Sequence, residues 1–135
     1  MRYKQVEDGF SNPNGAVNRL SLAWLSSVAK SIQDSVPSSS STRSSPGDLL
    51  ELYCGNGNHS VALSAFAGRV VSVELNGSLC TAARENLLMN DVTNVTIVHC
   101  DSAKFSGRVL RSKQYKDGSD GPEYQFSTVL VDPPR

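Results

Sequence analysis

The 135-residue sequence has no excess of charge of either sign, because thirteen Lys and Arg residues balance thirteen Asp and Glu residues. A protein that holds RNA through its phosphates usually carries a basic excess. The balance therefore argues against a stand-alone RNA-binding module. It does not exclude an RNA enzyme in which other parts of the protein bind the RNA.

The sequence also lacks a long apolar run and a paired cysteine motif. No stretch approaches the ~20 apolar residues that a membrane span needs, and the first ten residues, MRYKQVEDGF, have no apolar signal-peptide core. Three cysteines without a CxxC pair favour a reducing compartment over a disulfide scaffold or a zinc site. We expect no metal, a cytoplasmic location with nucleus or organelle left open, and buried packing roles for Cys54, Cys80 and Cys100.

One segment is of low complexity, namely the Ser-rich stretch 35–46 (SVPSSSSTRSSP). Such a composition predicts a flexible surface insertion. It follows an expected amphipathic helix over 14–34, whose apolar side chains at helical spacing are Val17, Leu20, Trp24, Val28 and Ile32. The total length suits one domain, so we expect a single partial domain over 1–135 with this insertion.

Strands and helices then alternate along the chain. Apolar runs predict strands over 48–53, 70–75, 94–100 and 127–131. Helices are expected between them, over 58–66, from a Ser78 cap to near Asn90, and over 101–110, with a polar loop over 111–124. This alternation predicts a Rossmann-like α/β domain with a parallel sheet. Because the sequence stops at DPPR after the fourth strand, we expect a truncated sheet.

The segment DLLELYCGNGN (48–58) joins an apolar strand to a Gly-rich turn and a helix. Glycines there allow positive φ and a close approach of the backbone to a ligand. A dinucleotide fingerprint needs a third glycine where this chain has Ser60, and no P-loop lysine is present. Glu74 follows at the end of the second strand, where a carboxylate can accept both ribose hydroxyls. We therefore favour S-adenosylmethionine over NAD, with Asp101 placed to meet the adenine amino group.

Four motifs occur in a familiar order and spacing: FSNPN (10–14), LLELYCGNGN (49–58), VEL (73–75) and VDPPR (131–135). On these motifs the chain resembles the RNA uracil-5-methyltransferases of tRNA and ribosomal RNA. The resemblance covers nearly the whole chain except the Ser-rich stretch and the 111–124 loop. It implies a class I methyltransferase domain, S-adenosylmethionine as cofactor and an RNA substrate. Of the two RNA classes, tRNA is favoured over ribosomal RNA as the substrate.

The resemblance also implies roles for individual residues. Tyr53 and Asn58 would flank the methionine and ribose parts of the cofactor, and Asp132 would lie where the methyl donor meets the base. Asn12 stands where the family usually has Gln. The expected cofactor-binding set is Asn12, Tyr53, Gly55, Gly57, Asn58, Glu74, Asp101 and Asp132.

In the resembled family a cysteine thiolate adds to carbon 6 of uracil, and it belongs to a Cys-Asn-Pro motif after DPPR. That motif is outside this sequence. We therefore assign no catalytic residue here and expect the chain alone to be inactive.

Each assignment has a structural alternative. Glu74 could be a solvated strand end, Tyr53 a cover for the sheet edge, and Asp101 a helix N-cap. Asp132 could belong to a rigid Pro-Pro turn. For the protein, the alternatives are another Rossmann-type methyltransferase or a non-catalytic cofactor-binding or partner module. A dinucleotide oxidoreductase is the least supported, given Ser60.

Overall fold

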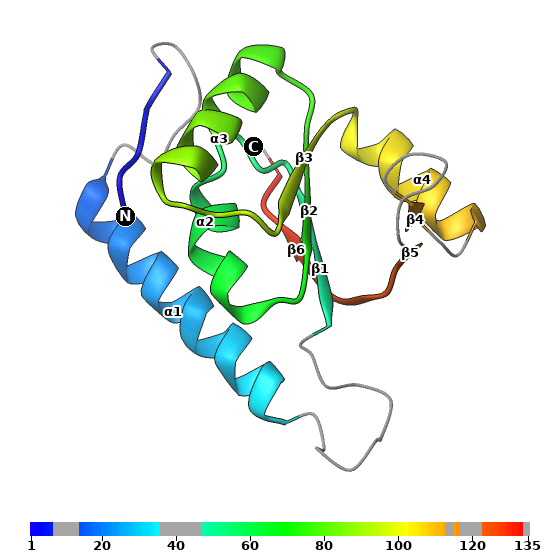
Figure 1. Cartoon of the computed structure of the whole chain (residues 1–135), viewed down its shortest axis with the longest axis horizontal. Helices are drawn as coiled ribbons and strands as arrows, with labels where there is room; N and C mark the ends of the chain where they lie inside the picture. Colours follow the sequence, from blue (N-terminus) through cyan, green and yellow to red (C-terminus); the bar gives the residue numbers. More distant parts are fainter. Residues whose placement is uncertain (7–13, 36–46, 113–114, 117–122, 134–135) are drawn as a thin grey trace.

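The computed structural model describes residues 1–6, 14–35, 47–112, 115–116 and 123–133 (Figure 1). The helices are α1 (Gly15–Asp34), α2 (Asn58–Leu63), α3 (Gly77–Met89) and α4 (Ser102–Ser112), with a short 3₁₀ helix, η1 (Ser64–Phe66), directly after α2. The strands are β1 (Asp48–Leu52), β2 (Val70–Glu74), β3 (Val95–His99), β4 (Tyr115–Lys116), β5 (Glu123–Tyr124) and β6 (Phe126–Val131). Most of the Ser-rich stretch, 36–46, lies outside the described residues.

The larger sheet has the strand order β3-β2-β1-β6, and every pairing in it is parallel. The two central strands are buried almost throughout, with Val70, Val71 and Val73 fully inaccessible. Parallel strands covered on both faces read as continuous apolar runs, which is why the sequence identified them. The predicted Rossmann-like parallel architecture is confirmed. In the part of the sheet that the structure describes, β6 is an edge strand.

Helices cover the sheet on both faces, with α1, α2 and α3 on one side and α4 on the other (Figure 1). Toward α4, Leu50, Leu52, Val71 and Val73 pack around the fully buried Phe105. Toward the other helices, Cys54 and Ile97 pack with residues of α2 and α3, chiefly Val61, Cys80, Ala83 and Leu87. Alternate strand residues thus supply the two halves of the core.

The segment expected to be a polar loop contains a two-strand antiparallel ladder, in which Tyr115 pairs with Tyr124. The prediction of a loop rested only on the polarity of 111–124, and it was wrong for the residues of this ladder. Tyr115 contacts Phe105 in a tilted arrangement and stacks on Phe126, with ring centroids 4.9 and 6.4 Å away. Four aromatic rings therefore hold this segment against the α4 side of the sheet.

Helix α3 begins earlier than expected, because its N-cap is Asn76 and not Ser78. The Asn76 Oδ1 accepts hydrogen bonds from the backbone N–H groups of Ser78 and Leu79, at 2.9 and 3.3 Å. Asparagine is among the best N-cap residues, so it captures these N–H groups at the end of the strand-to-helix turn.

The predicted helix is α1, but most of its apolar stripe faces solvent, and only Val28 of the stripe is half-buried. The exposed fraction is 72% for Leu20 and 64% for Trp24, and Val17 and Ile32 are exposed as well. Leu25 and Ala29, on another side of the helix, pack instead against the cluster of Leu49, Leu63, Ala67 and Val70. Through this side of the helix α1 contacts α2 and η1. Along the described ranges, no helix combines the length and apolar character that crossing a membrane requires.

Candidate cofactor site

Polar residues gather at the carboxyl ends of the four parallel strands. The turn 53–57 follows β1, Glu74 ends β2, Asp101 follows β3 and Asp132 follows β6. Because the strands are parallel, all four positions lie at the same edge of the sheet. In open α/β sheets this edge is where ligands bind.

The turn after β1 is built from residues in the left-handed region. Gly55 and Gly57 have φ of 58° and 81°, and Tyr53 has φ of 63°. A Cβ added at Gly57 would lie 3.2 Å from the Ala83 Cβ, so this glycine lets the turn pack closely on α3. A Cβ added at Gly55 would meet nothing within 4 Å. Gly55 thus leaves open space beside the turn, and Tyr53 holds a strained conformation of the kind found at functional sites.

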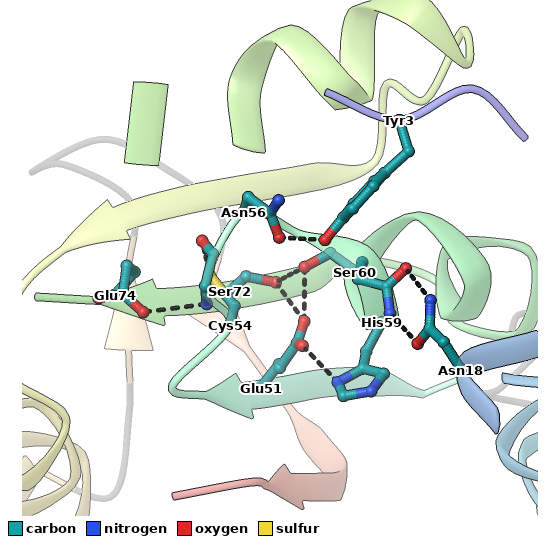
Figure 2. Close-up of polar contacts among 11 residues, drawn as sticks. Tyr3, Asn18, Glu51, Cys54, Asn56, His59, Ser60, Ser72 and Glu74 are labelled. Carbon is teal, nitrogen blue, oxygen red and sulfur yellow. Dashed lines mark hydrogen bonds and ion pairs between the residues drawn. The ribbon is translucent and has the colours of Figure 1, made fainter. Parts of the chain in front are cut away.

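The Glu74 carboxylate braces this turn from the end of the neighbouring strand. Its Oε2 accepts a hydrogen bond from the Gly55 N–H at 2.9 Å (Figure 2). Its Oε1 accepts one from the Asn76 N–H at 2.7 Å. Glu74 is therefore an ordered part of the turn rather than a freely solvated strand end. Each carboxylate oxygen can accept a further hydrogen bond, so the group keeps capacity for a pair of hydroxyls.

A second carboxylate, Glu51, is buried beneath the turn with 1% of its side chain exposed. Its Oε2 accepts hydrogen bonds from the hydroxyls of Ser60 at 2.5 Å and Ser72 at 3.1 Å (Figure 2). Its Oε1 lies 3.5 Å from the His59 Nδ1 and has no hydrogen-bond partner. Ser60, which replaces the third glycine of a dinucleotide fingerprint, therefore links α2 to β1 and β2.

The cysteines beside the turn are packing residues. Cys54 is buried, and its N–H donates to the Val73 carbonyl at 3.0 Å. Burial raises the pKa of the Cys54 thiol far above its ordinary value, and the Glu51 and Glu74 carboxylates raise it further. Burial likewise raises the pKa of Cys80. Cys100 is half-buried beside the α4 side of the core. The expectation of buried roles holds fully for Cys54 and Cys80.

Two of the other predicted site residues, Asn58 and Asp101, have hydrogen-bond partners of their own. The Asn58 side chain exchanges hydrogen bonds with Asn18 of α1, at 2.7 and 3.4 Å, and so points toward that helix. Asp101 accepts from the Lys104 N–H at 2.8 Å, which is an N-cap contact for α4. Asp132 is exposed and acts electrostatically on His59. Asn12 lies outside the described residues.

Sequence reasoning missed Tyr3, Asn56 and Asn86, which meet on the far side of the turn from Glu74. Asn56 is the middle residue of the Gly-Asn-Gly motif, with 3% of it exposed, and Asn86 is fully buried in α3. An asparagine on the otherwise apolar face of a helix was the available signal. The described residues contain no group of three or more His, Cys, Asp or Glu that could hold a metal ion.

Solved structures with the same arrangement define the class of this domain. A SAM-dependent methyltransferase from Agrobacterium tumefaciens superposes with a TM-score of 0.62 at 19% identity, over 86% of this chain and 31% of that one. The precorrin 8w decarboxylase structure from Methanobacterium thermoautotrophicum gives 0.56 at 15% identity, over 78% and 49%. The chain has the Rossmann-like fold of class I methyltransferases.

The family follows from the sequence comparison. The family described as tRNA (Uracil-5-)-methyltransferase matches residues 1–135, and the chain belongs to it. The tRNA/tmRNA (uracil-C(5))-methyltransferases of Aromatoleum aromaticum and Azoarcus sp. are 39% and 41% identical over 137 residues. These matches take in 100% of this chain and 34% of each relative, so the chain spans about a third of their length. Family and fold together indicate S-adenosylmethionine as the cofactor.

Proposed function

We propose that this chain forms the cofactor-binding part of an S-adenosylmethionine-dependent enzyme that methylates carbon 5 of uridine in RNA, with tRNA the first candidate substrate. Membership of the uracil-5-methyltransferase family supports the reaction, and the names of the bacterial relatives support the substrate. The observation that carries the cofactor assignment is the Glu74 carboxylate, held by the N–H groups of Gly55 and Asn76 at the edge where parallel sheets bind ligands.

The residues at this edge fit the cofactor. Glu74 keeps acceptor capacity for the ribose hydroxyls, and the open side of Gly55 leaves room for a ligand next to the backbone. Tyr53 and Asp132 are exposed beside this space, and Asp101 follows the next strand. When bound, S-adenosylmethionine would supply an electrophilic methyl group, and the residues of this chain would hold and orient it. Asn12 and Asn58 complete the proposed set.

The attacking thiolate is proposed to come from another part of the protein. Carbon 5 of uracil needs activation by a nucleophile at carbon 6. A cysteine can act as that nucleophile only when it is an accessible thiolate. Cys54 and Cys80 are buried with raised pKa values, so they are unsuited to the task. We assign no catalytic residue to the 135 residues and place the nucleophile in the Cys-Asn-Pro segment of the resembled family.

Calorimetry with S-adenosylhomocysteine and NAD tests the cofactor assignment. We expect binding of S-adenosylhomocysteine and none of NAD. Glu74→Gln removes one acceptor oxygen and should weaken binding about ten-fold, the loss of roughly 1–2 kcal/mol of hydrogen bonding. Glu123→Gln, at the exposed position of strand β5, is the matched control. Binding of NAD without a response to S-adenosylhomocysteine would refute the assignment, and unchanged affinity in folded Glu74→Gln would remove Glu74 from the site.

A methyl-transfer assay on unmodified tRNA tests the reaction. The 135 residues alone should form no 5-methyluridine, whereas a longer protein that includes a Cys-Asn-Pro segment should form it. Methylation by the chain alone that is lost on substitution of Cys54, Cys80 or Cys100 would overturn the placement of the nucleophile.

A further inference from the structure

The first residues of the chain form an extended segment that α3 holds through two asparagines. Asn90 accepts a hydrogen bond from the Arg2 N–H at 2.8 Å and donates one to the Arg2 carbonyl at 2.6 Å. Asn86, one helical turn earlier, accepts from the Lys4 N–H at 2.6 Å and donates to the Lys4 carbonyl at 3.1 Å. Each amide thus uses both of its ends on one backbone residue, as a neighbouring β-strand would.

The spacing explains why alternate residues are held. Residues four apart on a helix rise by about 6 Å along its axis, and residues two apart on an extended chain are separated by about 6.6 Å. Asn86 and Asn90 therefore match Lys4 and Arg2 in register. We call residues 2–4, held in this way, the strap.

The strap is joined to the cofactor turn through Asn56. The Asn56 Nδ2 donates to the Lys4 carbonyl at 3.1 Å. The Asn56 Oδ1 accepts a hydrogen bond from the Tyr3 hydroxyl (Figure 2). Asn86 also donates to the Asn56 carbonyl at 2.8 Å. Burial raises the pKa of Tyr3 to about 12, so the hydroxyl remains a donor at neutral pH. Both ends of the Asn56 amide are therefore occupied by the strap.

The turn needs such support because its backbone restrains itself poorly. Gly55 and Gly57 both have positive φ, and glycine samples more backbone conformations than any other residue. Glu74 fixes the turn on one side through the Gly55 N–H. The strap restrains the turn on the other side, and it is formed by the first residues of the chain.

We propose that Tyr3, Asn56 and Asn86 are positioning residues that hold the cofactor turn in its binding conformation before the cofactor arrives. The inference deepens the proposed function, on which it rests. A turn already ordered in the free protein loses less conformational entropy on binding, and affinity rises accordingly. Loss of the strap contact should therefore appear as weaker cofactor binding together with a looser turn.

Tyr3→Phe is the sharpest test, because it removes the hydroxyl that bonds Asn56 and keeps the ring. We expect about three- to ten-fold weaker binding of S-adenosylhomocysteine, as for one lost hydrogen bond. In the free protein, hydrogen exchange should become faster at the Gly55 and Gly57 amides, whose acceptors are Glu74 and the Cys54 carbonyl. Saturating ligand should restore the protection.

Asn90→Ala is the matched control, because it removes two strap hydrogen bonds at Arg2 and one to the Asn86 carbonyl, none of which contacts the turn. We expect its ligand affinity to stay within about two-fold of the original chain and the exchange at Gly55 and Gly57 to be unchanged. A merely structural role of the strap would lower thermal stability in both variants and leave affinity alone.

Wild-type affinity and exchange in Tyr3→Phe would overturn the proposal. If the original chain binds no S-adenosylhomocysteine, the proposed function fails. Exchange in the free protein still decides the inference in that case: faster exchange at the turn in Tyr3→Phe alone supports it, and equal exchange in both variants overturns it.

Discussion

Helices α1 and α3 both carry apolar side chains at helical spacing, but these side chains are buried in α3 and largely exposed in α1. Leu79, Ala83 and Leu87 of α3 are buried against the sheet, whereas Leu20 and Trp24 of α1 are exposed. Both patterns are visible in the sequence. Periodicity identifies the apolar face of a helix, and the neighbouring elements decide whether anything covers that face.

The neighbours of the two helices explain the difference. Helix α3 directly follows β2 and packs on β2 and β3, so its apolar face meets strand residues such as Ile97. Helix α1 meets α2 and η1 instead. Its attachment includes Leu25 and Ala29 and the reciprocal amide pair between Asn18 and Asn58. The apolar residues of α1 that pack are thus only half-buried, and each substitution below measures one part of this contrast.

The largest effect is expected for Leu87→Ala in α3. Leu87 is 6% exposed and packs with Cys54, Val61 and Cys80. Its truncation removes buried surface and leaves a cavity, which costs about 2–5 kcal/mol of unfolding free energy. Leu88 is 77% exposed on the same helix, so Leu88→Ala should change stability by no more than about 0.5 kcal/mol. Urea denaturation measures both, and equal losses would contradict the assigned face of α3.

An intermediate effect is expected for Leu25→Ala in α1. Leu25 is half-buried against the Leu49, Leu63, Ala67 and Val70 cluster. Partial burial should make the loss about 1–2 kcal/mol, below that of a fully buried leucine. A loss as large as that of Leu87→Ala would show that α1 is as deeply packed as α3. No loss at all would show that α1 does not dock on η1 in solution.

His59 should make the stability of the fold depend on pH. It lies on α2, the helix that contacts α1. The nearby Glu51 carboxylate raises the pKa of His59, burial acts in the opposite direction, and Asp132 adds a smaller increase. A raised pKa means that protonation favours the folded chain. The contribution of His59 is fully present below its unfolded pKa of about 6.5 and is lost as the pH rises through the folded pKa.

Urea midpoints measured from about pH 6 upward, the lower end of this window, should therefore fall more in the original chain than in His59→Phe. His99→Gln is the control, since the chain has two histidines and His99 lies at the exposed end of β3. An identical pH dependence in His59→Phe would show that the ion pair with Glu51 does not stabilise the fold. A steeper fall in the variant would mean that the sign is wrong.

The sheet and the turn could be predicted from sequence because their signals are local. Val70, Val71 and Val73 form a buried run, and Gly55 and Gly57 mark a turn that needs positive φ. The strap could not be predicted, since it joins Lys4 to Asn86 across 82 positions and no local pattern pairs them. The orientation of α1 depends likewise on η1, and the β4–β5 ladder depends on aromatic contacts with α4 and β6.

The smallest effect is expected for Leu20→Ser, on the exposed stripe of α1. Leu20 is 72% exposed, so its replacement removes little packing. Serine has a slightly lower helix propensity than leucine, and we expect the free energy of unfolding to change by no more than about 0.5 kcal/mol.

The indole of Trp24, 64% exposed on the same stripe, should show the fluorescence of a hydrated ring in both proteins. Exposed apolar side chains that share one face favour association, and sedimentation should therefore show less self-association in Leu20→Ser. A loss above about 1.5 kcal/mol, well outside the range for surface sites, together with a shielded indole would place this stripe in a packed interface. The contrast between α1 and α3 would then disappear.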